Sequence, residues 1–139
     1  MRLIVIFSLL FIFFSCSERK VSGCAKFLTG SYYFFKKPER TRIVIERDSS
    51  NQTEYNPITD TITGYQIKWT SKCEYEVFNT YRTKKTPHDT SEMKAFIDLD
   101  KITTVKYRII EASSDFYICE SWEEGRSFIY IDTIWVLKY

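Results

Sequence analysis

Few side chains in this chain of 139 residues could take part in catalysis. The only histidine, His88, precedes Asp89, and a histidine oriented by a carboxylate can act as a general base. Neighbouring side chains on an extended chain point to opposite sides, so we interpret His88 as a solvated loop residue. A zinc site needs several His or Cys ligands, and the sequence offers too few.

Carboxylates provide two further candidates for a functional site. Asp98 and Asp100 alternate, which would place both on one face of an extended segment, as in a weak cation site. Glu120, Glu123 and Glu124 cluster beside a tryptophan and could form a sugar or cation patch. We interpret both groups as solvated charges, and we predict no catalytic residue, no metal and no cofactor. An enzyme built on these carboxylates is the least favoured hypothesis, because it requires them to be buried and to converge.

The charge balance bears on the partners of the protein. The formal net charge is only +2, whereas a nucleic-acid binder shows a strong basic stripe. The sequence therefore argues against nucleic acid as a partner. Lys36, Lys37, Arg40 and Arg42 form a local basic edge, which could face anionic lipids at about 1 kcal/mol for each residue. The commoner role of such residues is to protect the edge of a sheet.

The N-terminal segment has the features of an export signal. Arg2 is followed by an apolar run over residues 3–14 that only Ser8 interrupts. This run is too short for a membrane-spanning helix, which needs roughly 20 residues, and it fits the apolar core of a signal peptide. The run is followed by Ser15 and Cys16, which resemble the lipobox of bacterial lipoproteins.

The lipobox resemblance implies that residues 1–15 are removed and that Cys16 becomes the lipidated first residue. An attached acyl chain anchors a protein to a membrane at about 0.8 kcal/mol for each buried methylene. Ser17 follows the cysteine where an aspartate would imply retention in the inner membrane, so the resemblance favours an outer-membrane lipoprotein that faces the periplasm or the cell surface. The alternative is an ordinary secretory signal with an incidental cysteine.

Three more cysteines follow the predicted anchor, namely Cys24, Cys73 and Cys119. An exported domain folds in an oxidising compartment, so we expect a disulfide. Three pairings are possible, each of which leaves one free thiol, and spacing alone does not choose among them.

The elements that would position these residues are β-strands. From residue 65 to residue 81 the odd positions, Tyr65 and Tyr81 included, are mainly apolar and the even positions mainly polar, as on a strand with one buried face. This segment is too long for one strand, so we predict a hairpin with its turn at residues 70–72. Further strands are expected at 31–35, 41–47, 52–55, 102–112, 116–122 and 126–138, with a strand start near Thr61 and one helical turn at 92–94. About eight short strands at this spacing are typical of an antiparallel barrel or sandwich.

Two segments carry a resemblance to a known family. Residues 24–34 are CAKFLTGSYYF and residues 67–75 are IKWTSKCEY. They resemble a family of small uncharacterised lipoproteins of Bacteroidetes-type bacteria, in which C-x-x-F-x-T-G-x-(aromatic) precedes an arginine-bearing second strand and then W-x-x-x-C-x-Y. Here Arg47 stands near the end of the second strand. Members sometimes carry the label DNA topoisomerase IV, which a short, exported and nearly neutral chain does not support.

This resemblance implies a lipocalin-like, calycin-type antiparallel barrel, partial or closed, over residues 24–139. The lipidated cysteine and a polar tether would occupy residues 16–23. The resemblance also implies that Cys24 pairs with Cys73, since both match the family pattern, and that Cys119 is the free thiol. Closing the long loop between the paired cysteines would stabilise the domain by about 4 kcal/mol in the chain-entropy model.

A barrel of this kind either packs its interior or holds one small ligand. The aromatic residues that could line such a cavity are Tyr32, Phe34, Tyr65, Trp69, Tyr75, Trp122 and Trp135. We expect a lipid-anchored, non-enzymatic envelope domain with a binding or structural role. One alternative is a carrier of a small apolar ligand, which a cavity above roughly 300 Å³ would favour. Another is an inhibitor or immunity-type partner of a second protein, which a large exposed apolar patch would favour.

Overall fold

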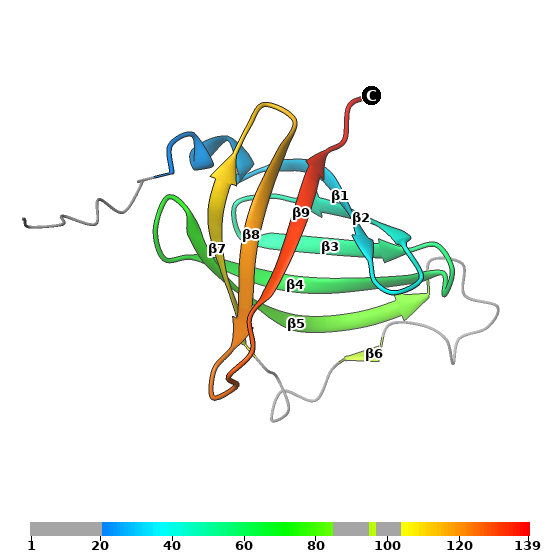
Figure 1. Ribbon diagram of the computed structural model, residues 1–139. Coiled ribbons are helices and arrows are strands. Elements are labelled where there is room, and N and C mark those ends of the chain that lie inside the picture. The colour runs from blue at the N-terminus through cyan, green and yellow to red at the C-terminus, as the bar shows by residue number, and fades with distance from the viewer. Residues whose placement is uncertain (1–20, 85–94, 97–103) are drawn as a thin grey trace, which may run out of the picture.

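Strands make up most of the chain in the computed structural model, which describes residues 21–84, 95–96 and 104–139 (Figure 1). In this part of the chain a short 3-10 helix, η1 (Cys24–Phe27), precedes nine strands. The strands are β1 (Gly30–Lys36), β2 (Thr41–Arg47), β3 (Asn51–Asn56), β4 (Thr61–Trp69), β5 (Glu74–Lys84), β6 (Ala95–Phe96), β7 (Val105–Ala112), β8 (Phe116–Glu123) and β9 (Tyr130–Val136). The predictions for residues 1–15, Cys16, His88, Asp89, the helical turn at 92–94, Asp98 and Asp100 lie outside the described residues.

Eight of the strands close into an antiparallel barrel. The hydrogen-bonded order runs β4-β3-β2-β1-β9-β8-β7-β5, and β5 pairs with β4 to complete the ring. The pairing of β1 with β9 places Tyr32 opposite Val136. In Figure 1, β3, β4 and β5 cross behind β7, β8 and β9 at a steep angle, as expected when a twisted sheet closes on itself. The predicted all-β, lipocalin-like fold is confirmed, and the barrel is closed.

The strand β6 stands outside this ring. It pairs with the end of β5 at Tyr81 and Arg82, whereas β7 pairs with the start of β5, from Glu74 to Val77. The long strand β5 therefore has two neighbours along the same edge. Within the residues that the structure describes, no helix is long and apolar enough to cross a bilayer.

Alternating residue types explain which side of each strand faces the barrel interior. In β2, Thr41, Ile43, Ile45 and Arg47 are buried, while Arg42 between them is exposed. Successive side chains on a strand point to opposite faces, so Arg47 shares the interior face with two isoleucines. The interior therefore holds a positive charge as well as apolar side chains.

The alternation predicted for residues 65–81 changes face near its end. Tyr65 pairs with Asn79 but Gly64 pairs with Tyr81, so β5 contains one extra residue at this point. A bulge of this kind re-aims the side chain that follows it. A Cβ atom on Gly64 would lie 2.1 Å from Cε1 of Tyr81, which shows that the Tyr81 ring covers Gly64 on the face opposite to Tyr65. The prediction that Tyr81 shares the buried face with Tyr65 is therefore wrong.

The other predicted strands match the observed ones to within one residue, except those predicted at 102–112 and 126–138. The strand β7 begins at Val105, and β6 was not predicted. The predicted hairpin is present, because β4 ends at Trp69 and β5 begins at Glu74. The last strand begins at Tyr130 and not at residue 126. The backbone N–H of Arg126 donates to the Glu123 carbonyl at 3.1 Å, which holds the chain in a turn where a strand was predicted.

One end of the barrel is filled by η1 and aromatic rings. Phe27 is only 1% exposed, and its ring centroid lies 4.7 Å from that of Tyr117. A disulfide between Cys24 and Cys73 joins η1 to the turn before β5, so the predicted pairing is confirmed. Cys119 is free and buried. The sequence did not predict η1, which is too short to show a helical repeat.

Candidate functional site

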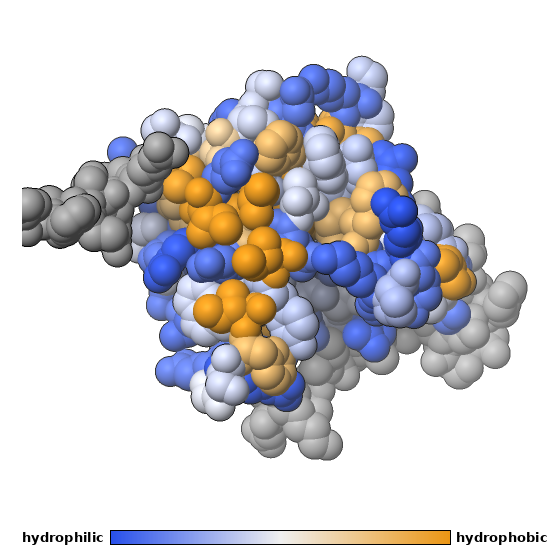
Figure 2. Space-filling model, in the orientation of Figure 1, coloured by the Kyte–Doolittle hydropathy of each residue, from blue (hydrophilic) through white to orange (hydrophobic). Residues whose placement is uncertain are grey.

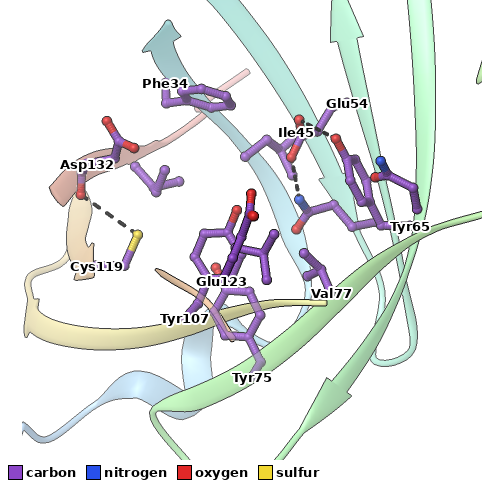
Figure 3. A pocket seen from close by; sticks show the side chains of 14 residues that line it. Phe34, Ile45, Glu54, Tyr65, Tyr75, Val77, Tyr107, Cys119, Glu123 and Asp132 are labelled. Atoms are coloured by element: carbon purple, nitrogen blue, oxygen red, sulfur yellow. Dashed lines mark hydrogen bonds between the residues drawn. The ribbon is translucent and has the colours of Figure 1, made fainter. Parts of the chain in front are cut away.

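A cavity of about 340 Å³ lies inside the barrel, next to the packed end (Figure 3). All eight strands of the ring contribute side chains to its wall, so closure of the barrel alone fixes its shape. Its apolar lining residues are Phe34, Ile45, Val77, Val105 and Ile134. An eight-stranded barrel can hold one small ligand, and ligand pockets commonly measure about 300–1,000 Å³.

The rest of the cavity wall is polar. These lining residues are Gln52, Glu54, Tyr65, Tyr75, Asn79, Tyr107, Cys119, Glu123 and Asp132. They include three carboxylates, and none of the described lining residues is Lys, Arg or His. The wall thus combines negative charge with tyrosine rings and aliphatic side chains.

Two neutral donors hold the carboxylate of Glu54 on β3. Nε2 of Gln52 donates to Oε1 of Glu54 at 2.7 Å, and the hydroxyl of Tyr65 on β4 donates to Oε2 at 3.2 Å (Figure 3). Burial raises the pKa of Glu54 above its usual value, although both hydrogen bonds and the charges of Arg47 and Lys36 oppose the rise. Glu54 is therefore a partly desolvated acid, tied to two strands.

This raised pKa predicts how Glu54 affects stability as the pH changes. An acid whose pKa is higher in the folded state stabilises that state at low pH, and the contribution is lost as the pH rises through the folded pKa. The Glu54→Gln variant should lack this loss. We therefore expect the free energy of unfolding of the variant, relative to that of the native chain, to increase from pH 4 to pH 8 in urea titrations. Glu120→Gln, on the outer face of β8, is the matched control, and a difference for Glu54→Gln that is flat across this range would contradict the prediction.

Gln52 links Glu54 to a buried arginine. Nε of Arg47 donates to Oε1 of Gln52 at 2.8 Å, and Nη2 donates to the hydroxyls of Tyr75 and Tyr117 at 3.2 and 3.0 Å. Nη1 of Arg47 donates to the backbone carbonyl at residue 27 at 3.2 Å. The residue is only 6% exposed, and all four acceptors are neutral. The charges of Arg47 and Glu54 are thus connected through an amide.

Aromatic rings connect the arginine to the cavity wall. The guanidinium carbon of Arg47 lies 4.7 Å from the ring centroid of Tyr75, which is within the range of a cation–π interaction. Tyr75 stacks in turn on Tyr107, with centroids 4.9 Å apart and an interplanar angle of 2°. Burial raises the pKa of both phenols well above the usual value, so both present neutral hydroxyls at physiological pH.

Strands β8 and β9 supply the opposite wall. The thiol of Cys119 donates to the backbone carbonyl oxygen of Asp132 at 3.8 Å, and burial raises the pKa of Cys119 to about 12. A thiol with so little thiolate is a poor nucleophile. Oε2 of Glu123 lies 2.6 Å from Nε of Arg126. Within the described part of the chain, the carboxylate of Asp132 makes no hydrogen bond or ion pair.

A second hollow of about 390 Å³ adjoins the cavity. It shares Phe34, Glu54 and Tyr65 with the cavity wall and adds Lys36 and Arg82. Basic side chains therefore stand beside Glu54 but not inside the cavity.

Only some of the aromatic residues that were predicted to line a cavity do so. Phe34, Tyr65 and Tyr75 do line it. Tyr32 is 2% exposed in the packed core, where its hydroxyl donates to a backbone carbonyl in the turn before β1. Trp69 packs on the Tyr75 ring at 4.7 Å, outside the cavity wall.

The two remaining tryptophans lie on the outer face of the barrel. The Trp122 ring lies 5.5 Å from the guanidinium carbon of Arg108, and Trp135 is 36% exposed beside Phe116. Both alternate with inward-facing residues of β8 and β9, so neither reaches the cavity.

The glutamates of the predicted acidic cluster also lie in different places, one at the cavity and two away from it. Glu123 lines the cavity, whereas Glu120 faces outward and Glu124 lies in the turn after β8. Among the described residues, no group of three His, Cys, Asp or Glu side chains could hold a metal ion. Gln52, Glu54 and Asp132 also line the cavity and were not among the predicted site residues, although their place on alternating strands marks them as inward-facing.

The fold and this site define a closed, lipocalin-like β-barrel with a polar internal cavity. Comparison with protein families, with curated proteins and with solved structures finds no match to the chain. Its function therefore has to be argued from the cavity and from the sequence.

Proposed function

We propose that this protein is a lipid-anchored component of the bacterial cell envelope whose barrel binds a small ligand without transforming it. The observation that carries the proposal is the cavity of about 340 Å³, which falls in the size range of small-molecule sites. A barrel with no ligand to bind would be expected to fill this space with side chains, as small closed barrels do.

The chemistry of the wall supports binding over catalysis. Glu54 is occupied by two hydrogen bonds, and Glu123 is paired with Arg126. The thiol of Cys119 is deeply buried and protonated. Asp132 pairs with Cys119 across β8 and β9, but the thiol stays protonated, so the described wall lacks the activated nucleophile that acyl or group transfer would need.

The proposed location rests on the N-terminal sequence. Export by a signal peptide over residues 1–15, lipidation at Cys16 and placement in the outer membrane follow from the apolar run and the lipobox-like ending. A disulfide between Cys24 and Cys73 is in keeping with an oxidising compartment.

The ligand proposal is tested on the full chain extracted from a bacterial envelope in mild detergent. Native mass spectrometry should find a small molecule that leaves the barrel on denaturation. Val105→Trp, which puts an indole into the cavity, should lack this molecule, whereas Ile131→Trp on the exposed surface should keep it. An empty native barrel, or equal loads in native and Val105→Trp proteins, would contradict a ligand in the cavity.

The anchor is tested separately with Cys16→Ser. We expect the native chain to sediment with membranes and to carry the added mass of acyl chains, and the variant to be released from the membrane. A variant that stays in the membrane fraction at the mass of the native protein would rule out lipidation at Cys16.

A second candidate function is interaction with another protein. Figure 2 shows apolar side chains gathered over the face formed by β7, β8 and β9. Ile129, Tyr130 and Ile131 are each more than half exposed, and Ile110 is 37% exposed. Large exposed apolar patches often mark interaction sites, so a protein partner, for example in an inhibitor or immunity role, is the alternative. Crosslinking in envelope fractions, with Ile131→Glu as the variant that should abolish it, tests this alternative.

A further inference from the structure

We propose that the cavity binds a small organic cation, with its ammonium group against Asp132 of β9 and an apolar body against the tyrosine and aliphatic wall. The inference rests on the proposed function, because it names the class of ligand that the cavity would take. It departs from the apolar ligand that an aromatic lining would have implied.

The charge of the cavity wall is the first reason. Glu54, Glu123 and Asp132 all face the enclosed space, and none of the described lining residues is basic. In the view of Figure 3, Asp132 and Glu54 lie on opposite sides of the cavity with Glu123 between them. A cleft lined by charges of one sign attracts ions of the opposite sign, so such a wall favours a cation and disfavours an anion.

Nearby basic groups compensate two of these three carboxylates. Oε2 of Glu123 lies 2.6 Å from Nε of Arg126. Glu54 accepts hydrogen bonds on both of its oxygens, and the charges of Arg47 and Lys36 act on it. Glu54 therefore needs no ligand to satisfy it, whereas Oε2 of Glu123, although paired in charge, is buried and accepts no hydrogen bond within the described residues.

The remaining carboxylate, that of Asp132, has no such compensation. It makes no hydrogen bond or ion pair with any residue that the structure describes. The residue opposite Asp132 on β8 is Cys119, whose protonated thiol cannot neutralise it. A bound ammonium group would supply the opposite charge and the hydrogen-bond donors that the described wall does not offer to Asp132.

A second, independent feature is the hydroxyl of Tyr107 on β7. Burial is the main cause of its strongly raised pKa, and the residue lines the cavity. Among the described residues it has no hydrogen-bond partner, and Figure 3 draws none. The hydroxyl oxygen is therefore accessible in the cavity, where it can form a hydrogen bond with the polar end of a ligand.

The remaining wall suits an apolar or planar body. The stacked rings of Tyr75 and Tyr107 offer an aromatic surface, and Val77 and Ile134 are buried beside the cavity. A cation over a tyrosine face gains a further cation–π contribution. An arylalkylamine satisfies all of these features, whereas an ammonium ion alone uses only the charge.

The test uses three probes that share one aromatic body and differ in the polar group: 2-(1-naphthyl)ethylamine, 2-(1-naphthyl)ethanol and 1-naphthylacetate. Their dissociation constants are measured by calorimetry with the full chain at pH 7. We expect the amine to bind about tenfold tighter than the alcohol, which corresponds to about 1.4 kcal/mol, and the carboxylate to bind weakest. Asp132→Asn should remove the preference for the amine and leave the affinity for the alcohol unchanged.

Two further variants separate this inference from the function on which it depends. Glu120→Gln removes a carboxylate from the outer face of β8 and should keep the preference for the amine. Val105→Trp should block all three probes. Equal binding of amine and alcohol, or an amine preference that survives Asp132→Asn, would overturn the cation proposal but keep a ligand-binding barrel. Probe binding that is unaffected by Val105→Trp would overturn both, because the probes would then lie outside the cavity.

Discussion

Replacing Arg47 by alanine is expected to lower the free energy of unfolding by about 3–5 kcal/mol, near the upper end for a single substitution. The guanidinium is 6% exposed and donates four hydrogen bonds, two of them to tyrosine hydroxyls at 3.2 and 3.0 Å. Its removal leaves buried acceptors without a donor, and each such group costs about 1–3 kcal/mol unless water reaches it. Urea unfolding followed by tryptophan fluorescence measures the change.

The neighbouring arginine of the same strand provides the control. Arg42 lies on the outer face of β2, with its guanidinium carbon 4.2 Å from the Tyr33 ring centroid. An exposed contact of this kind contributes about 0.5–1 kcal/mol, so Arg42→Ala should change stability little. Arg47→Lys keeps the charge but loses the planar fork of donors, and it should fall between the two. A loss of under 1 kcal/mol for Arg47→Ala would contradict the role of Arg47 as the centre of this network.

The strands could be predicted because their signals are local. The strand β2 has the predicted limits, 41 and 47, because a turn follows it directly. In that turn Oδ1 of Asp48 accepts the backbone N–H groups of Ser50 and Asn51 at 2.8 and 2.7 Å, and Asp is a residue type that favours such turns. Residue types within a few positions therefore determine both the strand and its end.

The polar network could not be predicted as a network because its members are far apart in the sequence. Arg47 meets Tyr75 and Tyr117 across separations of 28 and 70 residues. Which tyrosines reach the guanidinium depends on the register of several strand pairs, and no local pattern encodes that register. The inward position of Arg47 was available from the alternation of β2, but its partners were not.

The places of the tryptophans illustrate a different limit. In β8 both faces carry large apolar or aromatic side chains, with Phe116, Ile118 and Trp122 on one face and Tyr117 and Cys119 on the other. Alternation then gives no contrast between buried and exposed positions. The outward position of Trp122 becomes clear only from the residues that pair with it, since Lys106 lies opposite.

Removing the disulfide is expected to have an effect as large as that of losing Arg47. Cys24 and Cys73 close a loop of 49 residues, which corresponds to about 4 kcal/mol in the chain-entropy model. The bond also holds η1, and with it the buried ring of Phe27, against the end of the barrel. The double variant Cys24→Ala with Cys73→Ala should therefore unfold at a much lower urea concentration than the native protein.

Reduction provides the internal control for this prediction, because it breaks the same bond without changing a residue. Dithiothreitol should lower the stability of the native chain by the same amount as the double substitution and should have no further effect on the double variant. Cys119→Ala removes a thiol that belongs to no disulfide, so this variant should respond to the reductant as the native chain does. A native protein whose unfolding midpoint does not move with reductant, once free thiols confirm that the bond is broken, would show that η1 is held by packing of Phe27 alone. The same result would assign the closure of this barrel end to the aromatic core around Arg47 and not to the covalent link.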